Sequence, residues 1–387
     1  MRAIELLPLV LALSCGGQSS GSKPPETVTP PPATATTVRV EDAGAPLAAA
    51  EAGASTPPSE EPFPPAKPTT IPLGAGDASA EARELRAGDD AFEKGDWAGA
   101  EGHYQAAKRA APTRVAARVG LARVRIAKSG QALDYGAANG NPEVVAAVRE
   151  LRACATQDAA FGPAHAELGR ALLMLGEGDA ALASLQRAVQ LLPDAPEVQS
   201  ALGVALLATG KKEESLTPLR RAAELDPGSA ARHGNLGTVL LLLGRVGDAV
   251  REFEIQARLA DGDARAHSDL GTALLAQNQL PRAVSELQRA VALDASRPSY
   301  HTNLGYAYQL LGRRPDAIAQ YREAIRIDDK FASAWINLAT VLAQDPSKRA
   351  EARAALMTAK KIDPTDPRVK ANLDELDALE KSEKAPK

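Results

Sequence analysis

Four of the five histidines recur at matching places in the chain, a pattern that invites comparison with a metal site. His233, His267 and His301 follow one another at intervals of 34 residues, and His165 lies two such intervals before His233. A metal ion needs each ligand at about 2 Å, whereas neighbouring helices pack roughly 8–10 Å apart. We therefore expect these imidazoles to pack between helices and not to bind a metal.

Other signatures of catalysis or cofactor binding do not occur in the sequence. It contains no H-E-x-x-H, no G-x-S-x-G and no G-x-x-x-x-G-K-[ST]. A formal net charge of −4 and an aromatic content of 3% leave no basic surface for nucleic acid. Cys154 falls where a small packing residue is needed. We expect no enzyme activity, no cofactor and no nucleic-acid partner.

The interval of 34 residues extends well beyond the histidines. The pair Leu-Gly begins at Leu168, Leu202, Leu236, Leu270 and Leu304, and Leu338 is followed by alanine. A sustained period of this length indicates a solenoid of repeated units. Six units share one frame: 162–195, 196–229, 230–263, 264–297, 298–331 and 332–366.

Each unit has the sequence signals of two short helices. Numbering a unit from its first residue, proline at position 18 suits the first turn of a second helix. Glycine at position 15 suits the left-handed residue that ends the first helix. These glycines are Gly176, Gly210, Gly244 and Gly312.

A second glycine, at position 8, lies inside the first helix, where it costs about 1 kcal/mol relative to alanine. Gly237 is one of five such residues. We expect it to face the small residue at position 20, Ala249 in its own unit, so that the two helix backbones approach closely.

The 34-residue pattern resembles the tetratricopeptide repeat (TPR), and Trp335-x-x-Leu338-Ala339 is near its Trp-x-x-Leu-Gly signature. The resemblance implies an all-α fold, a right-handed α-solenoid of stacked helical hairpins forming a TPR superhelix. We expect about eight units over 81–366, with an insertion near 129–141 in the unit 115–161. Residues 367–387 then form a capping helix and tail.

The composition changes sharply before the repeats. Thirteen prolines lie between Gly16 and Asp77, together with many alanines and threonines. So little apolar surface predicts a disordered linker over 15–77.

The first fourteen residues predict an export signal, because Arg2 precedes an apolar stretch too short to span a bilayer. The sequence LALSC resembles the lipobox of bacterial lipoproteins, which implies cleavage before Cys15 and lipid attachment to it. Gly16, where aspartate is absent, fits the outer-membrane sorting of those lipoproteins. An ordinary secretory signal, with a secreted or periplasmic product, stays open as an alternative.

In proteins with this repeat the first helices line a concave groove, and the resemblance implies that positions 6, 9, 12 and 13 point into it. An asparagine amide can both donate to and accept from an extended peptide backbone, and leucines add an apolar stripe. The predicted groove residues are Asn235, Thr238, Leu241, Leu242, Asp269, Thr272, Leu275, Asn303, Tyr306, Asn337 and Thr340.

The sequence therefore favours a non-catalytic protein–protein interaction scaffold, anchored by lipid to the outer membrane and facing the periplasm. Its partner would be an extended or helical protein segment, bound during assembly of an envelope complex. Lipoproteins of this plan include pilotins. Two alternatives stay open: an accessory, carbohydrate-related module of an enzyme complex, and a purely structural spacer.

Overall fold

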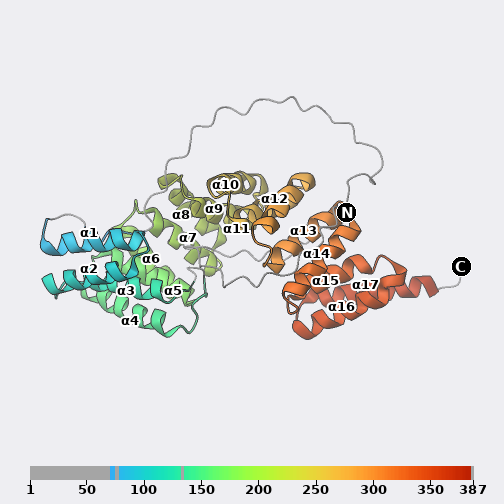
Figure 1. Ribbon diagram of the computed structural model, residues 1–387, viewed down its shortest axis with the longest axis horizontal. Helices are drawn as coiled ribbons and strands as arrows, with labels where there is room; N and C mark the ends of the chain where they lie inside the picture. Colours follow the sequence, from blue (N-terminus) through green and yellow to red (C-terminus); the bar gives the residue numbers. More distant parts are fainter. Residues whose placement is uncertain (1–69, 75–77, 132–134, 385–387) are drawn as a thin grey trace, which may run out of the picture.

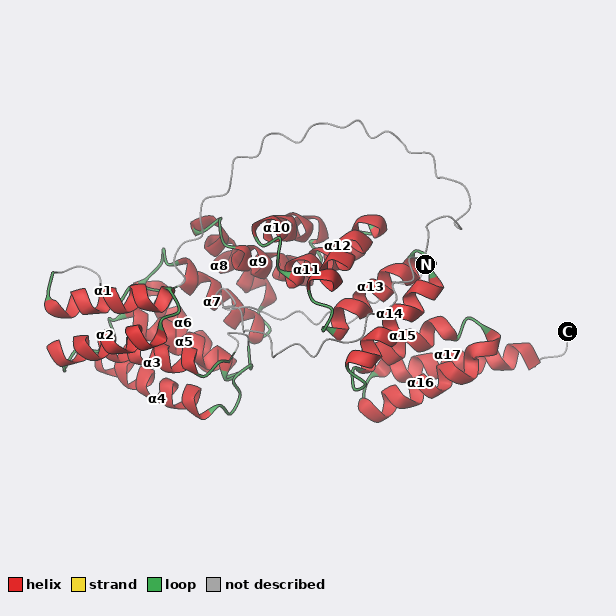
Figure 2. Ribbon diagram, viewed as in Figure 1, coloured by secondary structure: helices red, strands yellow, loops and turns green. Residues whose placement is uncertain are grey.

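The computed structural model describes residues 70–74, 78–131 and 135–384. The predicted signal peptide, Cys15 and most of the predicted linker lie outside these residues. Within the described ranges all regular structure is helical, with no strand (Figure 2). No helix in this part of the chain combines the length and apolar character needed to cross a membrane.

The helices follow one another as hairpins along a curved array (Figure 1). Their bounds are α1 Ala80–Glu93, α2 Trp97–Ala110, α3 Ala116–Lys128, α4 Pro142–Gln157, α5 Gly162–Met174, α6 Gly178–Leu191, α7 Pro196–Ala208, α8 Lys212–Leu225, α9 Ala230–Leu242, α10 Val246–Leu259, α11 Ala264–Ala276, α12 Leu280–Leu293, α13 Pro298–Leu310, α14 Arg314–Ile327, α15 Ala332–Leu342, the 3-10 turn η2 Pro346–Lys348, α16 Arg349–Ile362 and α17 Pro367–Lys384.

The repeat frame matches these bounds closely. From α5 to α13 every first helix begins at position 1 of its unit and every second helix begins at position 17. The glycines at position 15 have φ between 72° and 80° in these units, the left-handed conformation expected after a helix. Asn278 takes the same position in its unit with φ 59°, as the residue that tolerates this conformation best after glycine. The predicted α-solenoid is confirmed.

The glycine at position 8 leaves room chiefly for a large side chain of the second helix. A Cβ added to Gly237 would lie 2.8 Å from the ring of Phe253, at position 24. The residue at position 20 is a more distant neighbour, as at Gly271, where the Ala283 carbonyl oxygen would lie 3.4 Å from an added Cβ. The other four glycines of the series meet the position-24 side chain of their own unit in the same way, at 2.4 Å for Gly169 and 2.7 Å for Gly305. The large residue of the second helix therefore fills the space that the glycine leaves.

Curvature follows from how neighbouring units contact each other. Each second helix packs on the first helix of the next unit, and successive first helices, such as α9 and α11, also contact each other. Contacts between successive second helices are at most sparse among the described helices. The first helices thus form the more closely packed, inner layer of the arch in Figure 1.

Both ends of the array have additional packing. Helix α17 lies against α15 and α16 and buries Val369 and Leu376. At the other end Thr70–Gly74, which fall inside the predicted linker, are packed against the helices, with Ile71 and Leu73 buried. The average composition of 15–77 predicts disorder and does not reveal that these two apolar residues are packed.

We predict that Gly237→Ala lowers the free energy of unfolding by roughly 1–2 kcal/mol, because overpacking against Phe253 outweighs the gain in helix propensity. Gly102→Ala is the matched control, since Gly102 lies inside α2 with nothing within 4 Å of an added Cβ. Gly102→Ala should raise stability by up to about 1 kcal/mol. Urea unfolding followed by circular dichroism measures both, and equal effects would contradict the packing role of Gly237.

Candidate functional site: the concave face

The ring at position 4 makes one contact that recurs in five units. A side-chain ring nitrogen lies between 2.9 and 3.3 Å from the backbone carbonyl six residues earlier. In the last unit this nitrogen belongs to Trp335, whose indole N–H donates to the Asp329 carbonyl. The histidines therefore occupy the structural place of a tryptophan. The pairs are His165 with Ala159, His233 with Pro227, His267 with Asp261, His301 with Ala295, and Trp335 with Asp329.

The second nitrogen of three of these imidazoles is also occupied. Nδ1 of His233 lies 2.7 Å from Glu252, and the equivalent partners of the next two units are Glu286 and Gln320. Both ring nitrogens are thus used within the repeat. Among the described residues no three His, Cys, Asp or Glu side chains are grouped to hold a metal ion.

Position 6 links each unit to the one before it. The Asn303 amide donates to the Thr272 hydroxyl at 3.3 Å, and the Asn235 amide donates to Ser200 at the same distance. In α17 the same kind of pair has the opposite direction, because the Thr340 hydroxyl donates to Asn372 Oδ1 at 3.3 Å. The asparagines therefore connect neighbouring first helices.

Asn337 departs from this pattern. The preceding unit carries Tyr306 at position 9 in place of threonine. The Asn337 side chain is only 7% exposed, and its Nδ2 has no hydrogen-bond partner among the described residues. This nitrogen is enclosed by the protein, so the missing bond reflects the change from threonine to tyrosine in the preceding unit.

The predicted groove residues lie on the inner helices but differ widely in exposure. Leu242 is 42% exposed. Half-buried are Asp269, Leu275, Asn303, Tyr306 and Thr340, while Asn235, Thr238, Leu241, Thr272 and Asn337 are buried. The threonine hydroxyls donate to carbonyls of their own helix, as in Thr238 to Gly234 at 2.9 Å. The apolar part of the predicted groove is thus more accessible than its polar part.

Leucines at positions 12 and 13 form a strip along four successive first helices. Leu242 and Leu310 are 42% and 39% exposed, and Leu207 and Leu275 are half-buried. We call these four residues the leucine strip. Single exposed leucines are common on protein surfaces, and what distinguishes these four is that they recur at the same two positions of successive units.

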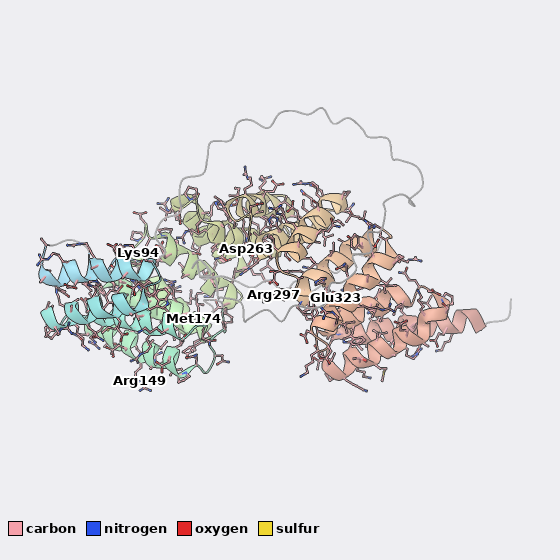
Figure 3. All side chains as sticks on the ribbon, in the orientation of Figure 1. Lys94, Arg149, Met174, Asp263, Arg297 and Glu323 are labelled. Atoms are coloured by element: carbon pink, nitrogen blue, oxygen red, sulfur yellow. The ribbon has the colours of Figure 1, made fainter. Side chains whose placement is uncertain are left out.

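In the unit of α5 the same two positions are covered by the chain itself. Leu173 and Met174, the latter labelled in Figure 3, are 0% and 1% exposed. The inserted segment after α3 lies over them: the N–H groups of Gly136 and Ala138 donate to the carbonyls of Leu173 and Met174 at 2.9 and 2.8 Å. The insertion therefore binds the carbonyls at the end of α5 and lies over the residues that correspond to Leu241 and Leu242.

A buried ion cluster lies on the inner face of α1, α3 and α5. Arg123 is 3% exposed and places Nη2 2.8 Å from Glu167 and Nη1 3.2 Å from Asp89. Burial opposes ionisation of Glu167, but the charges of Arg123 and Arg170 hold the pKa of Glu167 below its ordinary value. Burial raises the pKa of Asp89 in spite of the neighbouring guanidinium.

A second cluster joins α7, α8 and α9. Arg232 is 1% exposed, with Nη2 2.9 Å from Glu197 and Nε 2.8 Å from Asp226. Its Nη1 has no hydrogen-bond partner among the described residues.

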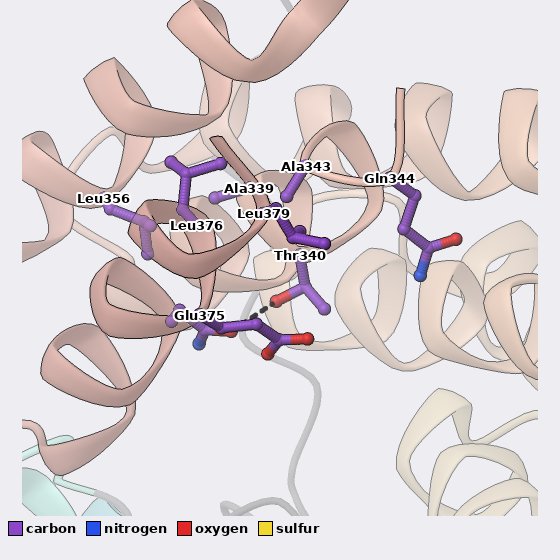
Figure 4. Close-up of a pocket in the computed structure, with 9 residues that line it drawn as sticks. Ala339, Thr340, Ala343, Gln344, Leu356, Glu375, Leu376 and Leu379 are labelled. Atoms are coloured by element: carbon purple, nitrogen blue, oxygen red, sulfur yellow. Dashed lines mark hydrogen bonds between the residues drawn. The ribbon is translucent and has the colours of Figure 1, made fainter. Parts of the chain in front are cut away.

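Two hollows in the described part of the chain differ in size and enclosure. One of about 50 Å³ lies where α15, α16 and α17 meet (Figure 4). Its lining includes Ala339, Leu356 and Leu376, with the Thr340 hydroxyl at one side. Another, of about 400 Å³, is an open hollow beside His267, Glu286 and Arg258.

Comparison with known proteins identifies the repeats. A family described as "TPR repeat" matches residues 271–312, and one described as "Tetratricopeptide repeat" matches 166–230 and 302–367. The chain contains tetratricopeptide repeats. No curated protein matches its sequence.

Solved structures share the TPR fold. The crystal structure of the APC/C hetero-tetramer Cut9-Hcn1 aligns with a TM-score of 0.57 over 77% of this chain and 56% of that chain, at 14% identity. MamA 41-end from Desulfovibrio magneticus RS-1 has a TM-score of 0.41 at 24% identity, covering 44% of this chain and 96% of that one. YrrB, described as a TPR protein with an unusual peptide-binding site, has 0.39 at 22%, covering 49% and 97%. The first similarity shows the fold alone, and this chain spans just over half of that relative.

Sequence reasoning missed the two buried ion clusters of the TPR array. Arg123 and Arg232 lie in helices that are otherwise largely apolar, and Glu167 takes position 6, where later units carry asparagine or aspartate. A charged residue at a position that other units fill with an apolar or amide residue is the sequence feature that could have indicated these clusters. Cys154, in contrast, is 0% exposed as expected of a packing residue, and burial raises the pKa of its thiol to about 11.

We predict that Asp269→Asn stabilises the protein at pH 7.5. Burial raises the pKa of Asp269 to about 6, against the opposing charge of Arg265, so the folded chain holds a proton that the unfolded chain releases. Stability associated with this group therefore falls as pH rises from about 4 to 6. The gain at pH 7.5 should be roughly 1–3 kcal/mol and should vanish near pH 4.

Thermal unfolding of wild type and variant across this pH range measures the difference. Asp374→Asn, at an exposed carboxylate of α17, is the control and should leave the pH dependence unchanged. A gain that is the same at both pH values would contradict the assignment.

Proposed function

We propose that the protein is a non-catalytic scaffold that binds a segment of a partner protein along the concave face of α7 to α15. The observation that carries this proposal is the leucine strip, exposed at Leu242 and Leu310 on the inner helices. The chain's own insertion covers the equivalent residues of α5, which supports the reading of this strip as a surface that a polypeptide can cover.

The polar groups beside the strip suit a peptide partner. The Asn303 amide and the Asp269 carboxylate are the accessible polar groups of position 6. Asp269 and Asn303 are half-buried and lie at position 6 of neighbouring units. An apolar stripe flanked by amide and carboxylate groups is the combination with which grooves bind extended or helical segments.

We further propose that Cys15 carries a lipid that anchors the chain to the outer membrane, with the repeats facing the periplasm. The support is the sequence LALSC preceded by an apolar stretch, and Gly16 after the cysteine. The partner segment would then belong to an envelope complex that the scaffold helps to assemble.

The groove is tested by site-specific photocrosslinking in cells, with the crosslinker in place of Leu242. Met357 on α16 is the matched control, because it is apolar, 45% exposed and on a second helix. We expect a discrete protein adduct from position 242 alone, identified by mass spectrometry. Equal adducts from both positions, or none, would support the spacer alternative, and binding of glycans without a protein adduct would support the carbohydrate-related one.

The anchor is tested separately with Cys15→Ser. A diacylated chain partitions stably into a membrane, whereas the same chain without acyl groups has no such affinity. We expect the variant to leave the membrane fraction, while wild type stays there and incorporates labelled fatty acid. Retention of the variant in membranes would rule out the lipid anchor and leave the groove proposal unaffected.

A further inference from the structure

The segment Thr70–Gly74, with sequence TIPLG, lies against the inner face of the first TPR units. Its side chains are mostly buried: Thr70, Ile71 and Leu73 are 7%, 4% and 5% exposed, Gly74 is also buried, and Pro72 alone is exposed. The segment has no regular secondary structure, so its backbone groups need hydrogen-bond partners from outside it. The segment therefore lies against the helices as a short non-helical peptide.

Four backbone groups of the segment are held by side chains of α1 and α3. The Thr70 N–H donates to Glu93 at 2.8 Å, and the Leu73 N–H donates to Asp89 at 2.7 Å. The Ile71 carbonyl accepts from Arg123 at 2.9 Å, and the Gly74 carbonyl accepts from Arg86 at 2.9 Å. In the repeat frame these four side chains hold positions 6, 9 and 13, the positions expected to face the groove.

Side-chain contacts add selectivity to this backbone recognition. Ile71 belongs to a buried cluster with Ala166, Ala188 and Val198, from α5, α6 and α7. Leu73 belongs to the core of the N-terminal units. A Cβ on Gly74 would lie 2.7 Å from the Ala82 carbonyl oxygen and 2.9 Å from the Arg86 nitrogen. The site thus accepts an apolar residue, proline, an apolar residue and then glycine.

The segment completes the hydrogen bonding of two ionic groups of this site. Arg123 and Asp89 are 3% and 8% exposed with the segment in place, and the segment supplies a carbonyl to one and an N–H to the other. A peptide of the same chemistry would replace both of these charge-assisted hydrogen bonds when it displaces the segment.

We propose that the inner face of α1, α3 and α5 is a binding site for a non-helical apolar-Pro-apolar-Gly peptide. Thr70–Gly74 is its built-in occupant, which a partner segment of the same chemistry displaces. This inference rests on the proposed function in that both assign peptide binding to the concave face, but it concerns different units from the leucine strip. The tethered segment competes at an effective concentration on the order of millimolar, so the site is held closed until a stronger peptide arrives.

The experiment measures binding of a fluorescent peptide with the sequence of residues 66–77, AKPTTIPLGAGD, to the full chain by anisotropy. The receptor is the variant Ile71→Ser/Leu73→Ser, which weakens the built-in occupant and leaves every receptor side chain in place. We expect it to bind the peptide at least about tenfold more tightly than wild type, because the tethered competitor is weakened. The same peptide with Gly74→Val is the matched control and should bind at least about tenfold more weakly.

A third receptor adds Glu93→Gln, which removes the carboxylate at an exposed position of α1 and should weaken binding several-fold. Equal binding to wild type and variant, or no binding while circular dichroism shows an intact array, would overturn the proposal. Loss of the fold in the double variant would also overturn it, since the segment would then be part of the core. None of these results bears on crosslinking at Leu242.

Discussion

The contact between glycine at position 8 and the large side chain at position 24 is the constraint on which the array depends. In each unit from α5 to α14 the second helix inserts a leucine, phenylalanine or tyrosine against a first-helix glycine, and no Cβ fits between them. The two helices of a hairpin are thereby held at one separation. Because every unit repeats that separation, neighbouring hairpins stack in one register, and the first helices of successive units come into contact. A close inner layer and a more open outer layer then curve the array, so the concave face follows from a local packing choice.

The same register decides what the polar residues of the inner face do. Residues 34 apart become neighbours across a unit boundary, which lets Asn303 reach Thr272 and lets Asn235 reach Ser200. The ring at position 4 likewise reaches the end of the preceding unit, whether the ring is imidazole or the indole of Trp335. Where the neighbour is of a different type the contact is missing, as for Asn337 after Tyr306. A repeat that pairs its own polar groups leaves unpaired donors and acceptors only at its irregular positions. Those positions are therefore the first to examine for contacts with a ligand.

Sequence alone predicted the helices because their signals are local and repeated. Gly244 and Gly312 end helices because glycine readily adopts the left-handed conformation. Where one unit has another residue at this position, as with Asn278, the 34-residue period still locates the end of the helix. The sequence identifies Gly237 as a packing residue and predicts Ala249 as its neighbour. Sequence separation does not tell which residue of the facing helix comes nearest, and in the structure it is Phe253. Burial of Arg123 with Glu167 depends on contacts 44 residues apart between units that differ in sequence, which periodicity does not encode. The docking of Ile71 and Leu73 could not be predicted either, because two apolar residues contribute little to the average composition of a proline-rich segment.

The concave face is not uniform along its length. In the N-terminal units the chain covers its own inner surface twice, with Thr70–Gly74 over the ion cluster of Asp89 and Arg123 and with the insertion over Leu173 and Met174. Both coverings use backbone groups of a non-helical segment, and the insertion covers position 13, which stays exposed as Leu242 and Leu310 in the units of α9 and α13. The two coverings are held differently: side chains of α1 and α3 bind the backbone of Thr70–Gly74, whereas backbone carbonyls of α5 bind the insertion. In the part of the chain that the structure describes, Leu242 and Leu310 have no such covering segment, which is why the proposed partner site is placed on the C-terminal half of the face.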